Sequence, residues 1–116
     1  IAYHNAVKVE ALGVAEATLA AHGAVSVETA REMAAGVRAR FGCDVGVSIT
    51  GIAGPGGGSE EKPVGTVCCA VDVRGDVVAH RRQMVGDREE VRQRSTQWAL
   101  DLLRRGLTGS LSKRPA

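Results

Sequence analysis

The segment from Ser48 to Thr66 constrains the fold of this 116-residue chain most, because it passes from a strand into a loop dense in glycine. Apolar and small or polar side chains alternate from Val45 to Thr50, a period of two that is typical of a β-strand. The glycines that follow are Gly51, Gly54, Gly56, Gly57 and Gly58. Glycine has no Cβ, so its backbone N–H can approach a ligand closely. Ligands of α/β sheets usually bind where strands end, and the segment therefore predicts an α/β fold with a site there.

Helical and strand patterns alternate along the remainder of the chain. The continuously apolar run from Val64 to Val73 predicts a central strand buried on both faces. The triplet Arg74-Gly75-Asp76 predicts a hairpin turn, and Asp87 with Glu90 forms a capping box that starts the last helix. The expected elements are a strand tail over 1–3, helices over 5–12, 16–22 and 27–41, strands over 45–50, 64–73 and 77–84, and a helix over 88–105. This order predicts one three-layer α/β/α domain with a mixed sheet.

Composition excludes several classes of function. The net charge is only +2, and Tyr3, Phe41 and Trp98 are the only aromatic residues, so neither a basic surface nor a stacking platform for nucleic acid is expected. No apolar run approaches the roughly 20 residues of a membrane span. Three cysteines, two of them adjacent, do not form a disulfide framework and favour a reducing cytoplasm. The histidines and cysteines lack metal-ligand spacing, so no metal or other cofactor is expected.

Three groups of residues are candidates for chemistry. Tyr3 and Lys8 lie five residues apart at the start of a helix and can point into one cavity, although a surface lysine beside a packed tyrosine is the simpler interpretation. A lysine becomes a base only when burial or a neighbouring charge lowers its pKa. Arg88, in the first turn of the last helix, can bind an anion, and Arg92 is a second candidate for that role.

The glycine loop is the third candidate, and its residues alone do not decide between a ligand-binding loop and a flexible connection. It lacks the Gly-Lys-Ser/Thr of a nucleotide-binding P-loop and does not open a helix. Neither Ser48 nor Ser59 has a histidine or carboxylate placed by the sequence to activate it as a nucleophile.

Short motifs, in order over nearly the whole chain, resemble the CinA C-terminal domain family. They are Tyr3, Asn5 and Lys8; Leu12-Gly13-Val14; His22-Gly23-Ala24-Val25-Ser26; the run from Ser48 to Pro55; Gly57-Gly58; the run from Lys62 to Val67; and Gly86-Asp87-Arg88. The resemblance implies a family domain over residues 1–106, incomplete at its start and lacking the first strand and helix. It also implies a homodimer as one expected assembly. The polar and basic residues at the end of the chain predict a disordered tail over 107–116.

The resemblance further implies a nicotinamide mononucleotide deamidase of the PncC type, which forms nicotinic acid mononucleotide and ammonia without a metal. In this family a serine attacks the amide, a lysine is the base and proton donor, and a tyrosine orients them. By position, Lys8 is that lysine and Tyr3 that tyrosine, while Thr50 is the substrate-contacting hydroxyl and Arg88 the phosphate partner. Gly51, Gly54, Gly57 and Gly58 would shape the pocket and supply backbone donors to the developing oxyanion.

One departure from the family pattern bears on activity. The family's nucleophile lies in a Ser-Cys-Thr-Gly-Gly motif upstream of the tyrosine and lysine, and this motif does not occur in the 116 residues. We therefore expect the 116 residues alone to be inactive and a longer parent to be active. The alternative function is a non-catalytic nucleotide-binding or interaction module, in line with the family's association with competence and DNA damage.

Overall fold

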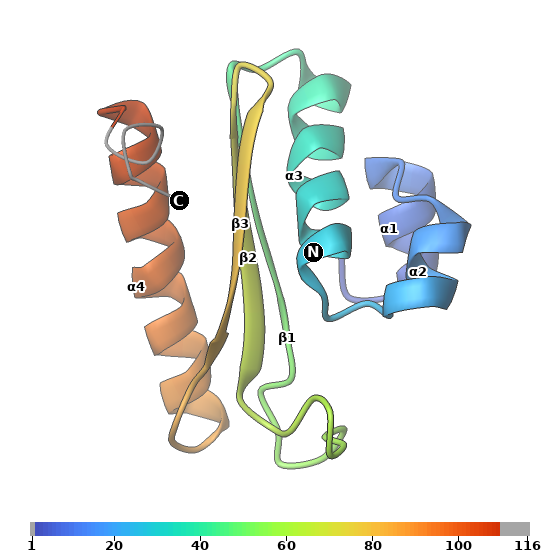
Figure 1. Cartoon of the computed structure of the whole chain (residues 1–116), viewed down its shortest axis with the longest axis vertical. Helices are drawn as coiled ribbons and strands as arrows, with labels where there is room; N and C mark the ends of the chain where they lie inside the picture. The colour runs from blue at the N-terminus through green and yellow to red at the C-terminus, as the bar shows by residue number, and fades with distance from the viewer. Residues whose placement is uncertain (1, 110–116) are drawn as a thin grey trace.

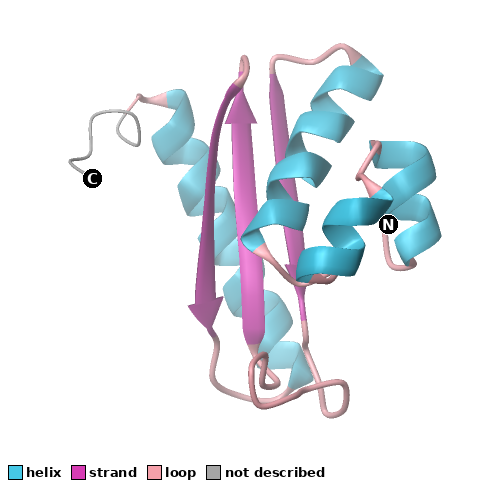
Figure 2. Ribbon diagram, turned by 45° about the vertical axis from the view of Figure 1, so that its right-hand side comes forward, coloured by secondary structure: helices cyan, strands magenta, loops and turns pink. Residues whose placement is uncertain are grey.

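The computed structural model describes residues 2–109, in which a three-stranded sheet lies between two helical layers (Figure 1). The elements are α1 (Asn5–Leu12), α2 (Glu16–His22), α3 (Val27–Phe41), β1 (Val45–Gly51), β2 (Thr66–Val73), β3 (Asp76–Gln83) and α4 (Arg88–Leu107). Helix α3 crosses one face of the sheet with α1 and α2 outside it, and α4 covers the other face (Figure 2). The predicted three-layer α/β/α arrangement is confirmed.

The sheet has the order β1-β2-β3, and both strand pairs are antiparallel. Strand β2 is central and buried from Thr66 to Asp72, as its apolar run predicts. A mixed sheet needs a parallel pair, and residues 2–109 contain none. The expected strand tail is also absent from its described part, because Ala2 and Tyr3 lie outside the three strands.

The predicted turn between β2 and β3 is confirmed. Arg74 and Gly75 have φ values of 53° and 93°, the left-handed values that a two-residue hairpin turn requires. The buried Asp72 accepts a hydrogen bond from Gly75 N at 2.7 Å and pairs with Arg38 of α3, its second oxygen lying 3.0 Å from Arg38 Nε. One carboxylate therefore ties the hairpin to the helix that crosses it.

Helix α4 has the predicted capping box, with the Asp87 carboxylate accepting from Glu90 N and the Glu90 carboxylate accepting from Asp87 N. It continues through Gly106 to Leu107, beyond the predicted end, and positions 110–116 of the expected tail lie outside the described residues. Its buried residues are Val91, Ser95, Trp98, Ala99 and Leu102. All of them except Ser95 form one cluster with Val67, Cys69 and Val71 of β2.

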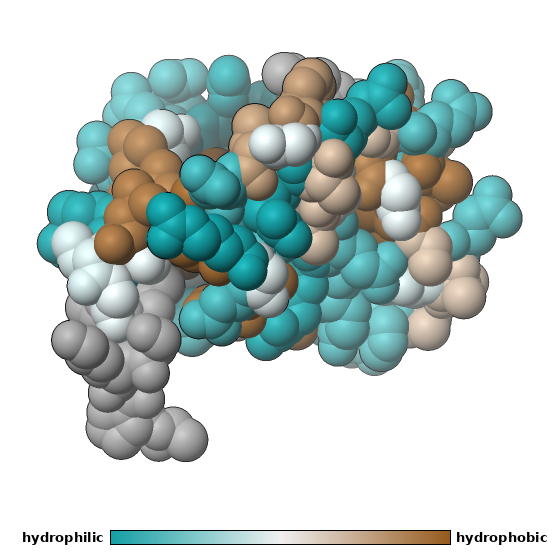
Figure 3. All heavy atoms as spheres, turned by 90° about the horizontal axis from the view of Figure 1, so that it is seen from above, coloured by the Kyte–Doolittle hydropathy of each residue, from teal (hydrophilic) through white to brown (hydrophobic). Residues whose placement is uncertain are grey.

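Helix α3 begins at the predicted cap, where the Ser26 hydroxyl accepts from Thr29 N at 3.1 Å. Ala30, Met33 and Ala34 follow helical spacing and are buried, but Phe41, at the same spacing, is 68% exposed. Phe41 is the last helical residue, and its exposure shows that helical spacing alone overestimates burial at a helix end. Seen from above, this end of the molecule is mostly hydrophilic with separate hydrophobic patches (Figure 3).

Candidate functional site

A pocket of about 630 Å³ opens beside β1, between the strand and helices α1 and α3. Its lining brings together residues that the sequence analysis singled out from two distant segments. These are Tyr3, Lys8, Thr50 and Gly51. The volume lies within the roughly 300–1,000 Å³ of pockets that hold small molecules.

Helix α1 contributes Lys8 to the lining of this pocket. Its last residue, Leu12, packs so closely on α3 that a Cβ at Gly36 would lie 1.6 Å from Leu12 O. A glycine at that position of α3 therefore lets the two helices approach closely and fixes the position of α1 relative to α3. As a result Lys8 is only 4% exposed, which excludes the interpretation of a surface lysine.

The Lys8 amine donates hydrogen bonds to two main-chain carbonyls, Ala2 O at 2.7 Å and Tyr3 O at 3.3 Å. Within residues 2–109 no carboxylate lies at ion-pair distance from it. Burial without a countercharge disfavours the ammonium and lowers the pKa of Lys8 below its usual 10.5. A neutral amine that keeps both carbonyl contacts has one lone pair left to accept a proton.

Tyr3 contacts Lys8 through its carbonyl oxygen, while its own side chain is 83% exposed. The ring lies edge-on to His4, with 5.2 Å between the ring centroids. The expectation of a packed tyrosine is therefore wrong, because residues 2–109 place no element over this ring.

Two hydroxyls line the pocket from the α3-facing side of β1. Thr50 donates to Ala24 O at 2.8 Å, and Ser48 donates to Ala30 O at 2.6 Å. Each hydroxyl has a single hydrogen, so in this arrangement both oxygens can only accept from a ligand. A ligand group beside Thr50 is then a donor, such as an amide N–H or a sugar hydroxyl.

The glycine loop is held against the fold at several points. Arg88 Nη1 donates to Gly54 O at 3.0 Å, Arg81 donates to Glu61 O at 2.6 Å, and Lys62 Nζ donates to His22 O. A Cβ at Gly58 would lie 2.7 Å from Val64 N, so this glycine is required by packing. These contacts anchor the glycine loop, so the loop is not merely a flexible connection between β1 and β2.

The predicted site residues thus fall into two groups. Gly54, Gly57, Gly58 and Arg88 are absent from the lining of the Lys8 pocket, and Arg88 is joined to Gly54 instead. The link between the groups runs along the chain, from Thr50 and Gly51 at the end of β1 into the loop.

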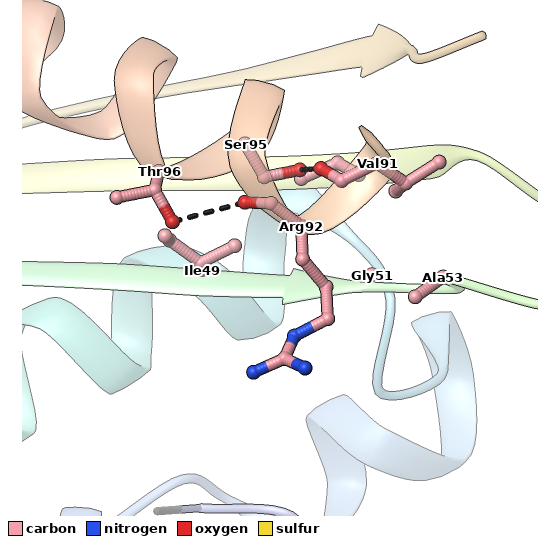
Figure 4. Close-up of a pocket in the computed structure, with 8 residues that line it drawn as sticks. Ile49, Gly51, Ala53, Val91, Arg92, Ser95 and Thr96 are labelled. Carbon is pink, nitrogen blue, oxygen red and sulfur yellow. Dashed lines mark hydrogen bonds between the residues drawn. The ribbon is translucent and has the colours of Figure 1, made fainter. Parts of the chain in front are cut away.

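A second, smaller pocket of about 240 Å³ lies on the α4 side of β1 (Figure 4). Ile49 and Gly51 line both pockets, and α4 contributes Arg92, Ser95 and Thr96 to the second. The sequence analysis named only Arg92 of these three. The signal for the other two was the small polar pair on α4, about two turns beyond the helix start.

Over residues 2–109 no three His, Cys, Asp or Glu side chains gather as metal ligands would. None of the helices there is both long and apolar enough to cross a bilayer.

Comparison with known proteins matches residues 1–107 to the CinA C-terminal domain. A CinA-like protein of Gemmatimonas aurantiaca is 61% identical over 105 residues, which cover 90% of this chain and 24% of that protein. A putative competence-damage inducible protein of Moorella thermoacetica is 55% identical over 107 residues, or 92% of this chain and 26% of that one. The chain thus spans about a quarter of the length of these curated relatives.

Solved structures give the same result for the fold. The competence/damage inducible protein CihA from Agrobacterium tumefaciens superposes with a TM-score of 0.83 at 45% identity, over 86% of this chain and 62% of that one. The competence damage-inducible protein A from Klebsiella pneumoniae gives a TM-score of 0.83 at 34% identity, over 97% and 67%. The chain therefore belongs to the CinA C-terminal domain family.

Proposed function

We propose that the protein to which these residues belong is an amidohydrolase that converts nicotinamide mononucleotide to nicotinic acid mononucleotide and ammonia. The observation that carries the proposal is Lys8, a buried amine without a countercharge among residues 2–109, at the base of a pocket of ligand size. Groups in clefts whose pKa is shifted by burial are candidates for catalysis, and a lowered pKa makes more of the lysine available as the neutral amine that can act as a base. The resemblance stated above supplies the reaction.

In the proposed reaction a serine hydroxyl attacks the carboxamide carbon while the Lys8 amine takes its proton. The tetrahedral intermediate collapses as Lys8 returns the proton to the leaving nitrogen, which departs as ammonia. Water then hydrolyses the acyl-enzyme to the carboxylate and regenerates the serine. Thr50, which can only accept, suits the N–H of the amide. Arg88, which donates to Gly54 O, would hold the loop glycines that complete the proposed substrate site.

The proposed serine is not one of those facing the described pockets. Ser48 and Ser95 already donate their hydroxyl hydrogens to main-chain carbonyls, at 2.6 Å in both cases. The Ser-Cys-Thr-Gly-Gly motif is absent from the 116 residues, and the curated relatives are about four times longer. We therefore assign the nucleophile to a residue outside this sequence.

The direct test incubates the longer native protein with nicotinamide mononucleotide and follows both ammonia and the acid product. Equal amounts of ammonia and nicotinic acid mononucleotide support the amidohydrolase. Release of nicotinamide instead would mean cleavage of the glycosidic bond and would reject the proposal.

A second candidate is a non-catalytic nucleotide-binding module. It is favoured by the name of the Moorella relative, which refers to competence and damage induction and not to a reaction. Saturable binding of the nucleotide without release of ammonia would support this candidate against the first.

A further inference from the structure

Among the described residues, Arg92 is the only cationic one in the lining of the second pocket. Its side chain extends from α4 across β1 at the level of Gly51, and in Figure 4 the guanidinium lies past the strand from the helix that carries it. It is 65% exposed, and the nearest carboxylate oxygen, on Glu89, lies 4.0 Å away. The guanidinium is therefore only weakly engaged within the protein and keeps donors for a ligand.

The other polar side chains of this pocket direct their hydrogens into the helix. Ser95 donates to Val91 O at 2.6 Å, and Thr96 donates to Arg92 O at 2.9 Å (Figure 4). The remaining lining is apolar, with Ile49 and Val67 among it. Arg92 is thus the side chain here that can offer several N–H groups to one anion, in the forked geometry that matches a phosphate.

Two neighbouring arginines on α4 differ from Arg92 in their surroundings. Arg88 donates to Gly54 O at 3.0 Å and so holds the loop. Arg94 lies 4.0 Å from Glu90 and lines a groove with Trp98 on the other side of the helix. Of the three, only Arg92 shares a pocket with Ile49 and Gly51, the residues that also line the Lys8 pocket.

We propose that Arg92 forms a phosphate subsite, which binds the phosphate monoester of a ligand whose reacting end lies beside Lys8. The small pocket is below the size of pockets that hold a whole small molecule, so it suits one end of a ligand that continues into the larger pocket. The identity of the ligand as a mononucleotide rests on the proposed function. Arg88 is then a loop-positioning residue.

The test compares nicotinamide mononucleotide with nicotinamide riboside, which lacks the phosphate, in the longer native protein. The variants are Arg92→Gln and, as matched controls on the same helix, Arg88→Gln and Arg94→Gln. A charge-assisted hydrogen bond contributes about 1.5–3 kcal/mol, so Arg92→Gln should reduce the preference in kcat/KM for the nucleotide over the riboside by about 10- to 150-fold. Arg94→Gln should leave that preference unchanged. An unchanged preference in Arg92→Gln, or a loss confined to Arg88→Gln, would overturn the inference.

A binding measurement separates this inference from the amidohydrolase. Inorganic phosphate is titrated into the longer protein carrying ¹⁵N-labelled arginine, and the Arg92 side-chain signal is assigned from the Arg92→Gln spectrum. A saturable shift of that signal without any ammonia release would retain the subsite and reject the reaction. The absence of a shift would reject the subsite whether or not the protein is an enzyme.

Discussion

The two faces of the sheet are built from different chemistry. The face under α4 is apolar, and Val91, Trp98 and Leu102 of one long helix close it with at most 5% of each side chain exposed. Burial of such side chains contributes about 1.5–3 kcal/mol each, so this face carries much of the stability of the domain.

The face under α3 also buries polar groups, and several of them have main-chain carbonyls as partners. Ser48 and Thr50 donate to carbonyls of α3 and of the segment before it, and Lys8 donates to the carbonyls of Ala2 and Tyr3. Buried polar groups that are paired add little net stability, but they hold donors and acceptors in fixed directions. The comparison teaches that most of the apolar burial lies under α4, while the buried base candidate lies on the α3 side of the sheet.

The largest expected effect tests the polar face. Lys8→Met in the longer protein keeps the aliphatic volume and removes the amine, so turnover should fall by about 10²- to 10⁴-fold, the usual contribution of a general base. The melting temperature should not fall, because the substitution removes an amine whose burial without a countercharge is unfavourable. Steady-state ammonia release and thermal denaturation measure both. Arg94→Met, which lines a groove on the other side of α4, is the control, and equal losses in the two variants would contradict the role of Lys8.

A substitution on the apolar face should lower stability and leave turnover by the folded protein intact. Trp98→Ala removes a side chain that is 5% exposed and carries the Arg82 guanidinium 4.9 Å from its ring centroid. We expect a loss of about 3–5 kcal/mol in the free energy of unfolding, measured in urea, with kcat retained by the folded fraction. A large loss of kcat at low temperature, where the variant is folded, would show that the faces are not separate.

A smaller effect should couple helix packing to the site. Gly36→Ala forces α1 away from α3, since the new Cβ would lie 1.6 Å from Leu12 O. Overpacking of this kind costs about 1–3 kcal/mol, and the displacement of α1 should also reduce turnover through Lys8. Gly56→Ala is the control, because a Cβ at that position would have no described neighbour within 4 Å. Turnover that is unchanged in Gly36→Ala would mean that Lys8 does not depend on this contact.

The smallest effect is on the pH dependence of stability. Because burial lowers the Lys8 pKa in the folded state, the unfolded chain binds more protons between that pKa and 10.5. The contribution of Lys8 to the free energy of unfolding should therefore rise with pH across this window and stay constant below it. Urea denaturation of the native protein and of Lys8→Met over alkaline pH gives the contribution as a difference. A difference that does not change with pH would contradict the lowered pKa.

The order and type of the described elements could be predicted from local signals. The glycines after α2 and α3, the cap at Ser26 and the box at Asp87 all act within a few residues, and each lies where the sequence indicates. Strand pairing depends on distant contacts, which explains why the antiparallel sheet was not predicted in place of a mixed one.

The candidate site shows the same limit. The sequence identified Lys8 and Thr50 but not their partners, because the hydrogen bonds to Ala2 O and Ala24 O depend on how α1 and α3 meet β1. The exposure of Tyr3 and the joining of Arg88 to Gly54 likewise follow from packing and not from spacing.

The central claim is that the pocket beside β1 holds the base of an amidohydrolase whose nucleophile lies outside these 116 residues. The most direct test measures ammonia release from nicotinamide mononucleotide by this chain and by the same chain with its native upstream sequence. We predict release by the longer form only. Release by the 116 residues alone would contradict the assignment of the nucleophile, and release by neither would contradict the amidohydrolase itself.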